Sequence, residues 1–363
     1  MKVLILGNYD MGLYKFRREL LEELVNRNHE VYVSIPDGEY IQQIKDIGCK
    51  VILTEFNRRG MNPVAEQKLY ITYCNIIKKV KPDKVLTYTV KPNIYGGLAA
   101  KKYHVPQIAN ITGLGTVIEN GGRKSNMILR LYQRGLSDAQ VVFFQNRANY
   151  DYFCNQQQIV KGRTIVIPGS GVNLTQHKFE PYPVDNGELV FLVIGRIMKD
   201  KGIDELLYAA ERIKKEFPQV YIKLIGSFDE EYQSKVNDAV NQGFVEFLGQ
   251  QDDVHSFIKN SHATISASYH EGMSNVLQET AAAGRPVIAT DIPGSIEIFE
   301  PYISGIPFKP HDAEDLARAV KEFIMLPYEK KAEMGLSGRK YVEKVFDRQI
   351  VVNKYMEEIE KEV

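Results

Sequence analysis

The sequence contains few of the residues that build disulfide frameworks or metal sites. Its 363 residues include three cysteines, Cys49, Cys74 and Cys154, and their separations match no metal-binding spacing. Because three thiols cannot all pair with one another, we expect a protein of a reducing compartment. The chain also has no D-x-D and no H-E-x-x-H sequence, so its residues predict no bound metal.

A net charge and a long apolar run are also absent. Lysine and arginine together number 46, as do aspartate and glutamate, so no global field attracts nucleic acid and any basic surface must be local. No apolar stretch approaches the roughly 18 residues that a membrane-spanning helix needs. The run Met1–Gly7 is too short for a signal peptide and leads straight into a strand and a turn. We therefore expect a soluble cytoplasmic protein that can still touch a membrane surface.

What the sequence does contain is a recurring alternation of short apolar runs and helical segments. A first strand at Lys2–Leu6 is followed by the loop Gly7–Gly12 and by a helix from Leu13 to about Asn28. Short strands rich in Val, Ile and Leu are typical of a parallel α/β sheet that is covered on both faces. Further strands are predicted at Glu30–Ile35, Lys50–Thr54, Lys84–Thr87, Gln107–Ile111, Ala139–Phe144, Thr164–Ile167, Leu189–Ile194, Val220–Ile225, Val245–Leu248, Ala263–Ser266, Val287–Ala289 and, more weakly, Ile303–Ile306.

This repetition divides into two α/β halves. A length of 363 residues favours roughly two domains. The turn Pro168–Asn173 follows the last strand of the first half and is the predicted linker. We therefore expect one Rossmann-like domain at residues 1–168 and a second at residues 174–345. Residues 340–362 carry apolar side chains at helical spacing, which predicts a terminal helix.

The loop Gly7–Gly12 has the spacing G-x-x-x-x-G, which is half of a phosphate-binding P-loop. Leu13 and Tyr14 follow where a P-loop has lysine and then serine or threonine, so the loop does not support nucleotide hydrolysis. The spacing is not G-x-G-x-x-G either, which counts against a nicotinamide cofactor. A tight turn without a ligand is the alternative interpretation.

The most informative stretch is 266–294, SASYHEGMSNVLQETAAAGRPVIATDIPG. It predicts the end of a strand, a polar loop, a helix that Ser274 or Asn275 can cap, and a buried strand. The free backbone N–H groups at the start of such a helix suit a phosphate.

Two carboxylates frame this loop, Glu271 before the helix and Glu279 inside it. If both were helical, they would lie about 12 Å apart along the axis, so we expect them to bind different parts of one extended ligand. A nucleoside diphosphate-sugar is such a ligand. An ordinary helix with two solvated glutamates is the alternative.

A basic loop, Gly195–Gly202, follows the first strand of the same half and reads G-R-I-M-K-D-K-G. Arg196 offers a planar fork of N–H donors and Lys201 a compact charge, so the pair can neutralise a diphosphate. A solvated loop with three unrelated cations is the alternative.

Together these motifs resemble the signature of family-4 retaining glycosyltransferases. The frame S-x-x-E-G-x-S-N-x-x-x-E, followed by A-x-G-x-P-V-I-A-T, spans Glu271 and Glu279, and G-R-x-x-x-x-K-G is similar to the family's diphosphate-binding motif. The linker is similar to the family's P-x-G-V-D segment, with Asn173 in place of the acid. The resemblance covers essentially the whole chain. It implies the GT-B fold, in which two Rossmann-like domains face each other across a cleft and a terminal helix, here about 346–363, packs back onto the first domain.

The resemblance also implies roles at the donor site. Glu279 would bind the ribose of a UDP-sugar, and Glu271 would contact the donor sugar or support the reacting face. Gly226 and the segment Gly249–Val254 would hold the base. Retention without a metal follows because cations and a helix N-terminus stabilise the leaving diphosphate. The residues expected in catalysis are Glu271, Arg196 and Lys201, and those expected at the nucleotide-sugar are Gly12, Arg196, Lys201, Gly226, Gly272, Met273, Ser274, Asn275 and Glu279.

The first half carries polar residues at or after predicted strand ends, where open α/β sheets bind ligands. These stretches resemble bacterial N-acetylhexosaminyltransferases that extend polyprenyl-diphosphate-linked saccharides, including capsule enzymes. The resemblance implies such an acceptor, met at the cytoplasmic face of the membrane. The segment Arg123–Arg134 interleaves cations with apolar residues, as a surface-lying membrane helix does; a helix buried on its own domain is the alternative. The residues expected at the acceptor are Arg17, Lys91, Asn93, Asn110, Thr112 and Arg123.

One departure from the family is Asn110, which stands where many members have a histidine that contacts the donor sugar. Two other functions fit the same motifs. A UDP-sugar epimerase of the same fold would convert its substrate without an acceptor. A regulator would bind the nucleotide-sugar without consuming it.

Overall fold

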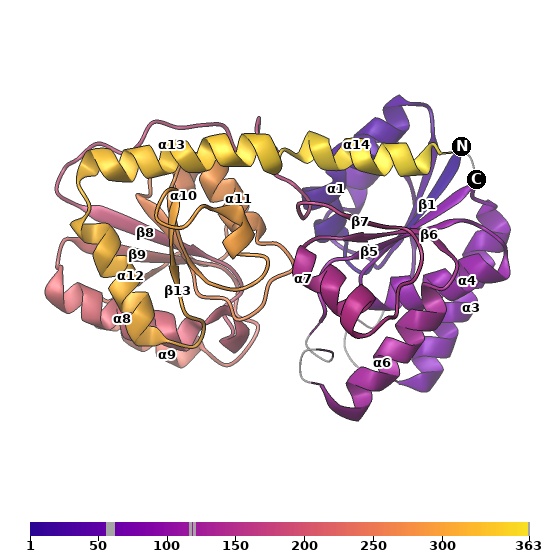
Figure 1. Cartoon of the computed structure of the whole chain (residues 1–363), viewed down its shortest axis with the longest axis horizontal. Helices are drawn as coiled ribbons and strands as arrows, with labels where there is room; N and C mark the ends of the chain where they lie inside the picture. The colour runs from indigo at the N-terminus through magenta and orange to yellow at the C-terminus, as the bar shows by residue number, and fades with distance from the viewer. Residues whose placement is uncertain (56–61, 116–117, 119–120, 362–363) are drawn as a thin grey trace. The chain divides into compact units, whose positions relative to one another are not determined.

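The computed structural model describes residues 1–361 apart from 56–61, 116–117 and 119–120. The chain folds into two compact units, each with its own sheet (Figure 1). Unit 1 comprises Met1–Ser170 and Arg348–Val363, and unit 2 comprises Gly171–Asp347. The chain therefore passes from one unit to the other twice, at 170–171 and at 347–348.

Unit 1 is built on a parallel sheet of seven strands in the order β3-β2-β1-β4-β5-β6-β7. The first strand of the chain, β1, is paired on both sides, with Leu4 opposite Tyr32 on one neighbour and opposite Val85 on the other. The strands are β1 (Lys2–Leu6), β2 (Glu30–Ile35), β3 (Lys50–Leu53), β4 (Lys84–Tyr88), β5 (Gln107–Ile111), β6 (Ala139–Phe144) and β7 (Thr164–Val166).

Helices cover both faces of this sheet because side chains along a strand point alternately to each face. The helices are α1 (Asp10–Asn26), α2 (Ile41–Asp46), α3 (Pro63–Val80), α4 (Gly97–Lys102), α6 (Gly122–Gly135), α7 (Arg147–Tyr150) and α14 (Arg348–Ile359), with π-helical turns at Pro92–Gly96 and Asp151–Gln156. Val3 and Ile5 pack in a cluster with α1, α2 and α14. Leu4 and Leu6 pack in another cluster with α3 and α4.

Unit 2 contains a parallel sheet of six strands in the order β10-β9-β8-β11-β12-β13. Its strands are β8 (Leu189–Ile194), β9 (Val220–Ile225), β10 (Glu246–Phe247), β11 (Ala263–Ser266), β12 (Val287–Thr290) and β13 (Gly305–Phe308). Its helices are α8 (Ile203–Glu216), α9 (Gln233–Asn241), α10 (His255–Lys259), α11 (Asn275–Ala282), α12 (Ala313–Met325) and α13 (Tyr328–Val345), with 3-10 turns at Lys199–Lys201 and Ile296–Ile298.

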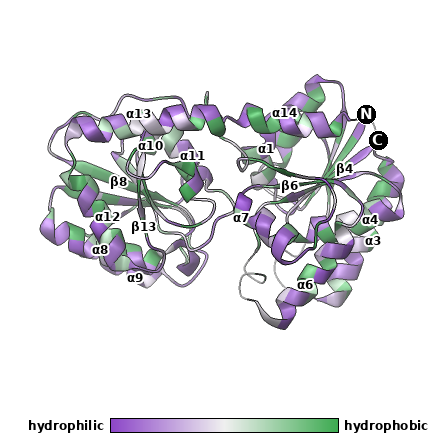
Figure 2. Cartoon of the chain, in the orientation of Figure 1, coloured by the Kyte–Doolittle hydropathy of each residue, from purple (hydrophilic) through white to green (hydrophobic). Residues whose placement is uncertain are grey.

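The helices of unit 2 also lie on both faces of their sheet. Helices α8, α9 and α12 pack in one cluster with Ile265 and Ile288, whereas α11 and α13 pack with Val287 and Ala289 on the other face. Figure 2 shows apolar residues concentrated in the strands of both units and mixed with polar residues along the helices. Each unit thus has a sheet buried on both sides, as its Val/Ile/Leu-rich strands predict.

The predicted strands are confirmed, with bounds that differ by at most two residues. The first helix differs more, because α1 begins at Asp10 rather than Leu13. Gly12 therefore lies in the first turn of a helix and not in a loop. The terminal helical segment consists of two helices, α13 and α14, and only α14 belongs to unit 1. Residues 362 and 363 of the predicted terminal helix lie outside the described residues.

The strand orders locate the binding edge of each sheet. In an open α/β sheet, ligands bind beyond the carboxyl ends of the two strands between which the strand order reverses. That point lies between β8 and β11 in unit 2, and between β1 and β4 in unit 1. The loops that follow β8 and β11 are 195–202 and 267–274, the two motif loops of the sequence.

Candidate active site

The two motif loops of unit 2 are held against each other. The backbone N–H of Tyr269 donates to the Asp200 carbonyl at 2.9 Å. Gly202 has a φ of 66°, and a Cβ there would lie 2.2 Å from the Ala267 carbonyl oxygen. Only glycine therefore allows this approach, which explains the terminal glycine of the basic loop.

Lys201 and Glu271 meet where these loops touch. Lys201 Nζ donates to Glu271 Oε1 at 2.6 Å, and the Ser268 hydroxyl donates to the same oxygen at 2.9 Å. The two charged side chains are 24% and 17% exposed, so the pair is partly shielded from water. The structure brings together two residues that lie 70 positions apart and that the sequence singled out separately.

Arg196 lies on the same loop as Lys201, but its side chain is more exposed to solvent. Its Nη1 donates to Asp229 Oδ2 at 2.6 Å, and its side chain is 56% exposed. The loop is also fixed by the Lys199 N–H, which donates to Glu230 Oε2 at 2.8 Å. Asp229 and Glu230 lie in the segment after β9, and no sequence motif indicates either of them.

Helix α11 begins beside Glu271, and Ser274 is its N-cap. The Ser274 hydroxyl accepts from the Leu277 N–H at 3.4 Å, and the Ser274 N–H donates to the Gly294 carbonyl at 2.8 Å. Ser274 is therefore the helix cap that the sequence predicted, and its contact with the nucleotide-sugar stays a prediction. Gly294 itself lies tightly against this loop, since a Cβ there would lie 2.7 Å from the Glu271 carbonyl oxygen.

Glu279 lies within α11 and has a histidine beside it. His177 Nε2 is 3.9 Å from Glu279 Oε1, and the two side chains are 6% and 14% exposed. Gly226 lies after β9, and its N–H donates to the Gly249 carbonyl at 2.9 Å, which joins two of the segments expected at the base. A Cβ on Gly226 would lie 1.8 Å from the Gly195 carbonyl oxygen, so these loops also pack closely.

In unit 1, two of the expected acceptor residues are part of a buried network. Asn93 and Asn110 are 0% and 1% exposed. Asn93 Nδ2 donates to the Asn110 carbonyl at 2.7 Å, Asn110 Nδ2 donates to the Thr87 carbonyl at 3.0 Å, and the Tyr355 hydroxyl donates to Asn110 Oδ1. The two amides therefore join β4, β5 and α14 and are not presented to a ligand.

Arg17 is also buried rather than solvated, at 6% exposure. Its guanidinium lies 5.4 Å from the Tyr88 ring centroid and 5.7 Å from that of Tyr355, which are cation–π distances. Burial raises the pKa of the Tyr88 phenol well above its usual value, so the ring stays neutral beside this cation. Arg17 therefore connects α1 with β4 and α14, and the expectation that it meets the acceptor is corrected.

The other expected residues of unit 1 are more accessible. Lys91 follows β4 and pairs with Glu66 at 2.6 Å, with side chains 15% and 12% exposed. Thr112 directly follows β5 and is half-buried, and Arg123 is exposed in the first turn of α6. Gly12, expected near the donor, is half-buried within α1.

A strained residue that the sequence did not reveal lies at the reversal point of unit 1. Thr89 follows β4 with a φ of 74°, a region that β-branched residues rarely adopt. Its hydroxyl is buried and has no hydrogen-bond partner among the residues that the structure describes. Such strain gathers at ligand sites, so Thr89 marks this edge of the sheet as a candidate binding surface.

The arrangement in unit 2 is suited to an anion that carries two phosphates. A lysine, an arginine and the start of α11 lie at one end of one sheet, where electrostatic stabilisation of a leaving group is possible. In the described part of the chain, no group of three or more His, Cys, Asp or Glu is placed to hold a metal ion. Independence from metal stays a prediction.

The fold and the site together define a class of protein. Two parallel α/β units, each with a sheet covered on both faces, form the GT-B architecture of glycosyltransferases. A glycosyltransferase from Rickettsia africae has the same fold, with a TM-score of 0.82 and 19% identity over 99% of each chain. The Anabaena protein HepE, crystallised with UDP-glucose, superposes with a TM-score of 0.80 and 20% identity over 99% of each chain.

Residues 175–341 match the family described as "Glycosyl transferases group 1", and residues 2–146 match "Glycosyl transferase 4-like". The two halves of the chain therefore match glycosyltransferase family models, which confirms the resemblance drawn from the motifs of Glu271 and Glu279.

Among relatives, an N,N'-diacetylbacillosaminyl-diphospho-undecaprenol α-1,3-N-acetylgalactosaminyltransferase of Campylobacter jejuni is 26% identical, over 98% of this chain and 97% of its own length. The capsular polysaccharide biosynthesis glycosyltransferase CapM of Staphylococcus aureus is 24% identical, over 92% and 90% respectively. These relatives bear out a role in glycosyl transfer.

Proposed function

We propose that this glycosyltransferase moves a sugar from a UDP-sugar to a polyprenyl-diphosphate-linked saccharide, with retention of configuration and without a metal. The observation that carries the proposal is Lys201, held beside Glu271 at the reversal point of the second sheet and next to the start of α11. Lys201 and Glu271 come from separate motifs, so their contact supports the proposal that both motifs serve one donor site. The sugar is proposed to be an N-acetylhexosamine, as in the relative from Campylobacter jejuni.

The diphosphate is proposed to bind to Lys201 and Arg196, which both already hold carboxylates. An ammonium has three N–H donors and a guanidinium has five, so each can serve a phosphate while it keeps its carboxylate. Glu271 and Asp229 therefore fix the two cations in advance. Fixed cations stabilise the charge that grows on the diphosphate as the bond to the sugar breaks.

The ribose, the base and the sugar of the donor are assigned to residues near the proposed diphosphate site. Glu279 accepts hydrogen bonds from the ribose hydroxyls, and the loops at Gly226 and Gly249, which are hydrogen-bonded to each other, hold the base. Glu271 lies between Lys201 and the start of α11, where it can support the sugar. The acceptor oxygen bonds to the anomeric carbon, the bond from that carbon to the diphosphate breaks, and the diphosphate takes the acceptor's proton.

The acceptor is assigned to unit 1 on chemical grounds. Relatives are named for undecaprenyl-diphosphate-linked substrates, which are anionic. Lys91, Thr112 and Arg123 remain candidates to meet such an acceptor, whereas Arg17, Asn93 and Asn110 maintain the fold.

Helix α6 is the proposed contact with the membrane surface. Its fourteen residues include four cations, Arg123, Lys124, Arg130 and Arg134, and no acid. The apolar residues Ile128, Leu129 and Tyr132 are buried on unit 1, so its outer face is basic, with Met127 47% exposed. Among the described residues, no helix is long and apolar enough to cross a membrane. Association at the cytoplasmic face would therefore be peripheral and electrostatic.

A panel of nucleotide-sugars with membrane lipid extracts, analysed by mass spectrometry, tests this proposal. We expect a UDP-sugar to be consumed and the lipid-linked saccharide to gain one sugar. Conversion of the UDP-sugar without any acceptor would instead indicate an epimerase. Binding of UDP without consumption of any donor would indicate a regulator.

A further inference from the structure

The segment that enters unit 2, residues 173–181, carries the histidine beside Glu279. It begins with a turn that Asn173 organises, since Asn173 Oδ1 accepts from the N–H groups of Thr175 at 2.9 Å and Gln176 at 2.8 Å. The His177 N–H then donates to the Asn173 carbonyl at 2.9 Å. The turn therefore fixes the backbone position of His177.

Three further contacts fasten this segment to the end of α11. Arg339 Nη1 donates both to the His177 carbonyl at 3.0 Å and to the Ala282 carbonyl at 2.7 Å. The Glu180 N–H donates to the Ala283 carbonyl at 3.2 Å. Arg285, which is fully buried, donates to the Glu180 carbonyl at 2.8 Å. The segment that carries His177 is thus joined by hydrogen bonds to the end of the helix that carries Glu279.

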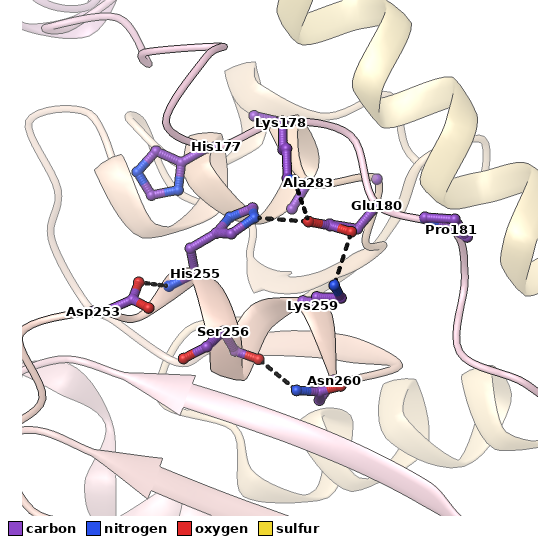
Figure 3. A network of polar contacts seen from close by, with 12 residues as sticks. His177, Lys178, Glu180, Pro181, Asp253, His255, Ser256, Lys259, Asn260 and Ala283 are labelled. Atoms are coloured by element: carbon purple, nitrogen blue, oxygen red, sulfur yellow. Dashed lines mark hydrogen bonds and ion pairs between the residues drawn. The ribbon is translucent and has the colours of Figure 1, made fainter.

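A second histidine packs behind the first. The ring centroids of His177 and His255 lie 5.6 Å apart with the ring planes at 74°, an edge-to-face contact (Figure 3). His255 opens α10, directly after the segment 249–254, and its N–H donates to Asp253 Oδ1 at 2.9 Å. The two rings therefore join the carboxylate of α11 to the end of the segment expected at the base.

His255 is itself anchored by a buried carboxylate. Its Nε2 lies 3.3 Å from Glu180 Oε1, and Lys259 and Lys178 lie 3.4 and 3.7 Å from the same carboxyl group (Figure 3). Burial opposes ionisation of Glu180, but its contacts with His255 and Lys259 outweigh it and lower its pKa. Glu180 is therefore an ionised anchor among three side chains that carry or can carry positive charge.

We propose that His177, supported by His255, is a positioning residue that orients the Glu279 carboxylate toward the donor ribose. The proposal rests on the donor site assigned above, in which Glu279 meets the ribose hydroxyls. A carboxylate on an unsupported side chain must lose rotamer freedom when it binds, which reduces affinity. A neighbour fixed by the backbone removes part of that cost in advance. The contact with His255 couples this orientation to the segment that holds the base.

The test compares the binding of UDP and of 2′,3′-dideoxy-UDP, which lacks both ribose hydroxyls, by calorimetry. His177→Ala should weaken UDP binding about tenfold, because the Glu279 carboxylate loses the neighbour that orients it. It should leave the binding of the dideoxy nucleotide within about twofold of the parent, because that ligand makes no contact with Glu279. In transfer assays, KM for the donor should rise while kcat stays within about twofold.

Two variants separate positioning from folding. His177→Gln retains a side-chain N–H near Glu279 and should restore most of the UDP affinity. Gln176→Ala alters the adjacent, exposed side chain outside the Glu180 cluster and should bind both nucleotides as the parent does. In a Glu279→Ala background, His177→Ala should have no further effect on UDP binding.

The possible failures are distinguishable. An equal loss of affinity for UDP and the dideoxy nucleotide in His177→Ala would overturn the positioning role, as would unchanged UDP binding by this variant. If the parent protein itself binds no uridine nucleotide, the proposed donor is contradicted instead.

Discussion

Lys201 and Arg196 each hold a carboxylate in the fold, and we propose that each also binds the diphosphate. In the free protein each is paired with a carboxylate, yet the Lys201 pair is partly buried whereas the Arg196 side chain is 56% exposed. Solvent screens an exposed charge more strongly than a partly buried one. We therefore assign Lys201 the larger share of the stabilisation of the leaving diphosphate.

Replacing these cations should reduce turnover more than donor affinity, because the charge on the diphosphate grows as the bond to the sugar breaks. We expect Lys201→Ala to lower kcat about 10²- to 10³-fold and Arg196→Ala to lower it less. Lys199→Ala is the matched control, since its side chain is exposed on the same loop. Steady-state kinetics with unchanged kcat in both cation variants would contradict the assignment.

Because of His262, the stability of unit 2 should depend on pH, independently of glycosyl transfer. The residue is 5% exposed, and its Nδ1 accepts from the Val190 N–H at 3.0 Å. Burial, followed by the nearby charges of Lys331 and Arg285, lowers the pKa of His262 to about 4. The unfolded chain binds the proton near pH 6.5, so stability is intact above that pH and is lost as the pH falls toward 4.

Between pH 7 and pH 5 this linkage should cost about 2 kcal/mol of the free energy of unfolding. His262→Gln removes the titrating ring and keeps an acceptor for the Val190 N–H. Urea unfolding at the two pH values should therefore show a smaller loss for His262→Gln than for the parent. An identical loss in both proteins would mean that other groups govern the acid sensitivity.

At the scale of helices and strands, the strands were predictable and several helix details were not. Each strand is a short apolar run bounded by turn residues, so its sequence reports its position directly. The sequence does not predict the start of α1 at Asp10, because the N-cap residue, Tyr9, makes no side-chain capping hydrogen bond. For the same reason, the sequence pattern places Gly12 in a loop, whereas it lies in α1.

The burial of Arg17 is indicated by its position on helix α1. Leu13, Leu20 and Leu24 form the buried stripe of α1, and Arg17 lies four positions after Leu13 on the same stripe. By contrast, the buried bonds of Asn93 and Asn110 and the contact of His177 with Glu279 join distant parts of the chain. Residue type and spacing carry no record of such contacts.

Helix α6 should respond to charge reversal more than to loss of apolar area, because its apolar side is buried on unit 1. Each surface cation contributes about 1 kcal/mol of attraction to an anionic leaflet. We expect the parent to bind vesicles more strongly as their acidic lipid content rises and less strongly in salt. The double variant Arg123→Glu, Lys124→Glu should lose vesicle binding. It should also lose the transfer of sugar to a membrane-embedded acceptor, while UDP binding is retained.

As a control, Lys101→Glu changes an exposed cation of α4 outside this helix and should bind vesicles as the parent does. Full activity of the α6 double variant on membrane-embedded acceptor, with no vesicle binding by the parent, would rule out this role for α6.

At the scale of the whole molecule, function is divided between two units of similar architecture. Each unit has one parallel sheet and one point at which the strand order reverses. In unit 2, that point carries paired cations and the start of α11, which suit a diphosphate. In unit 1, it carries strained Thr89 and the Lys91–Glu66 pair, without a dinucleotide fingerprint in the loop that follows β1. We therefore predict a UDP-sugar donor and no binding of a nicotinamide cofactor.

The most direct test of this claim is thermal or urea unfolding with UDP, with NAD and without ligand. A ligand at about one hundred times its dissociation constant adds roughly 2.7 kcal/mol to the free energy of unfolding. We predict that UDP stabilises the parent protein in this way, that Lys201→Ala responds less at the same concentration, and that NAD has no effect. Stabilisation by NAD, together with none by any nucleoside diphosphate, would contradict the account.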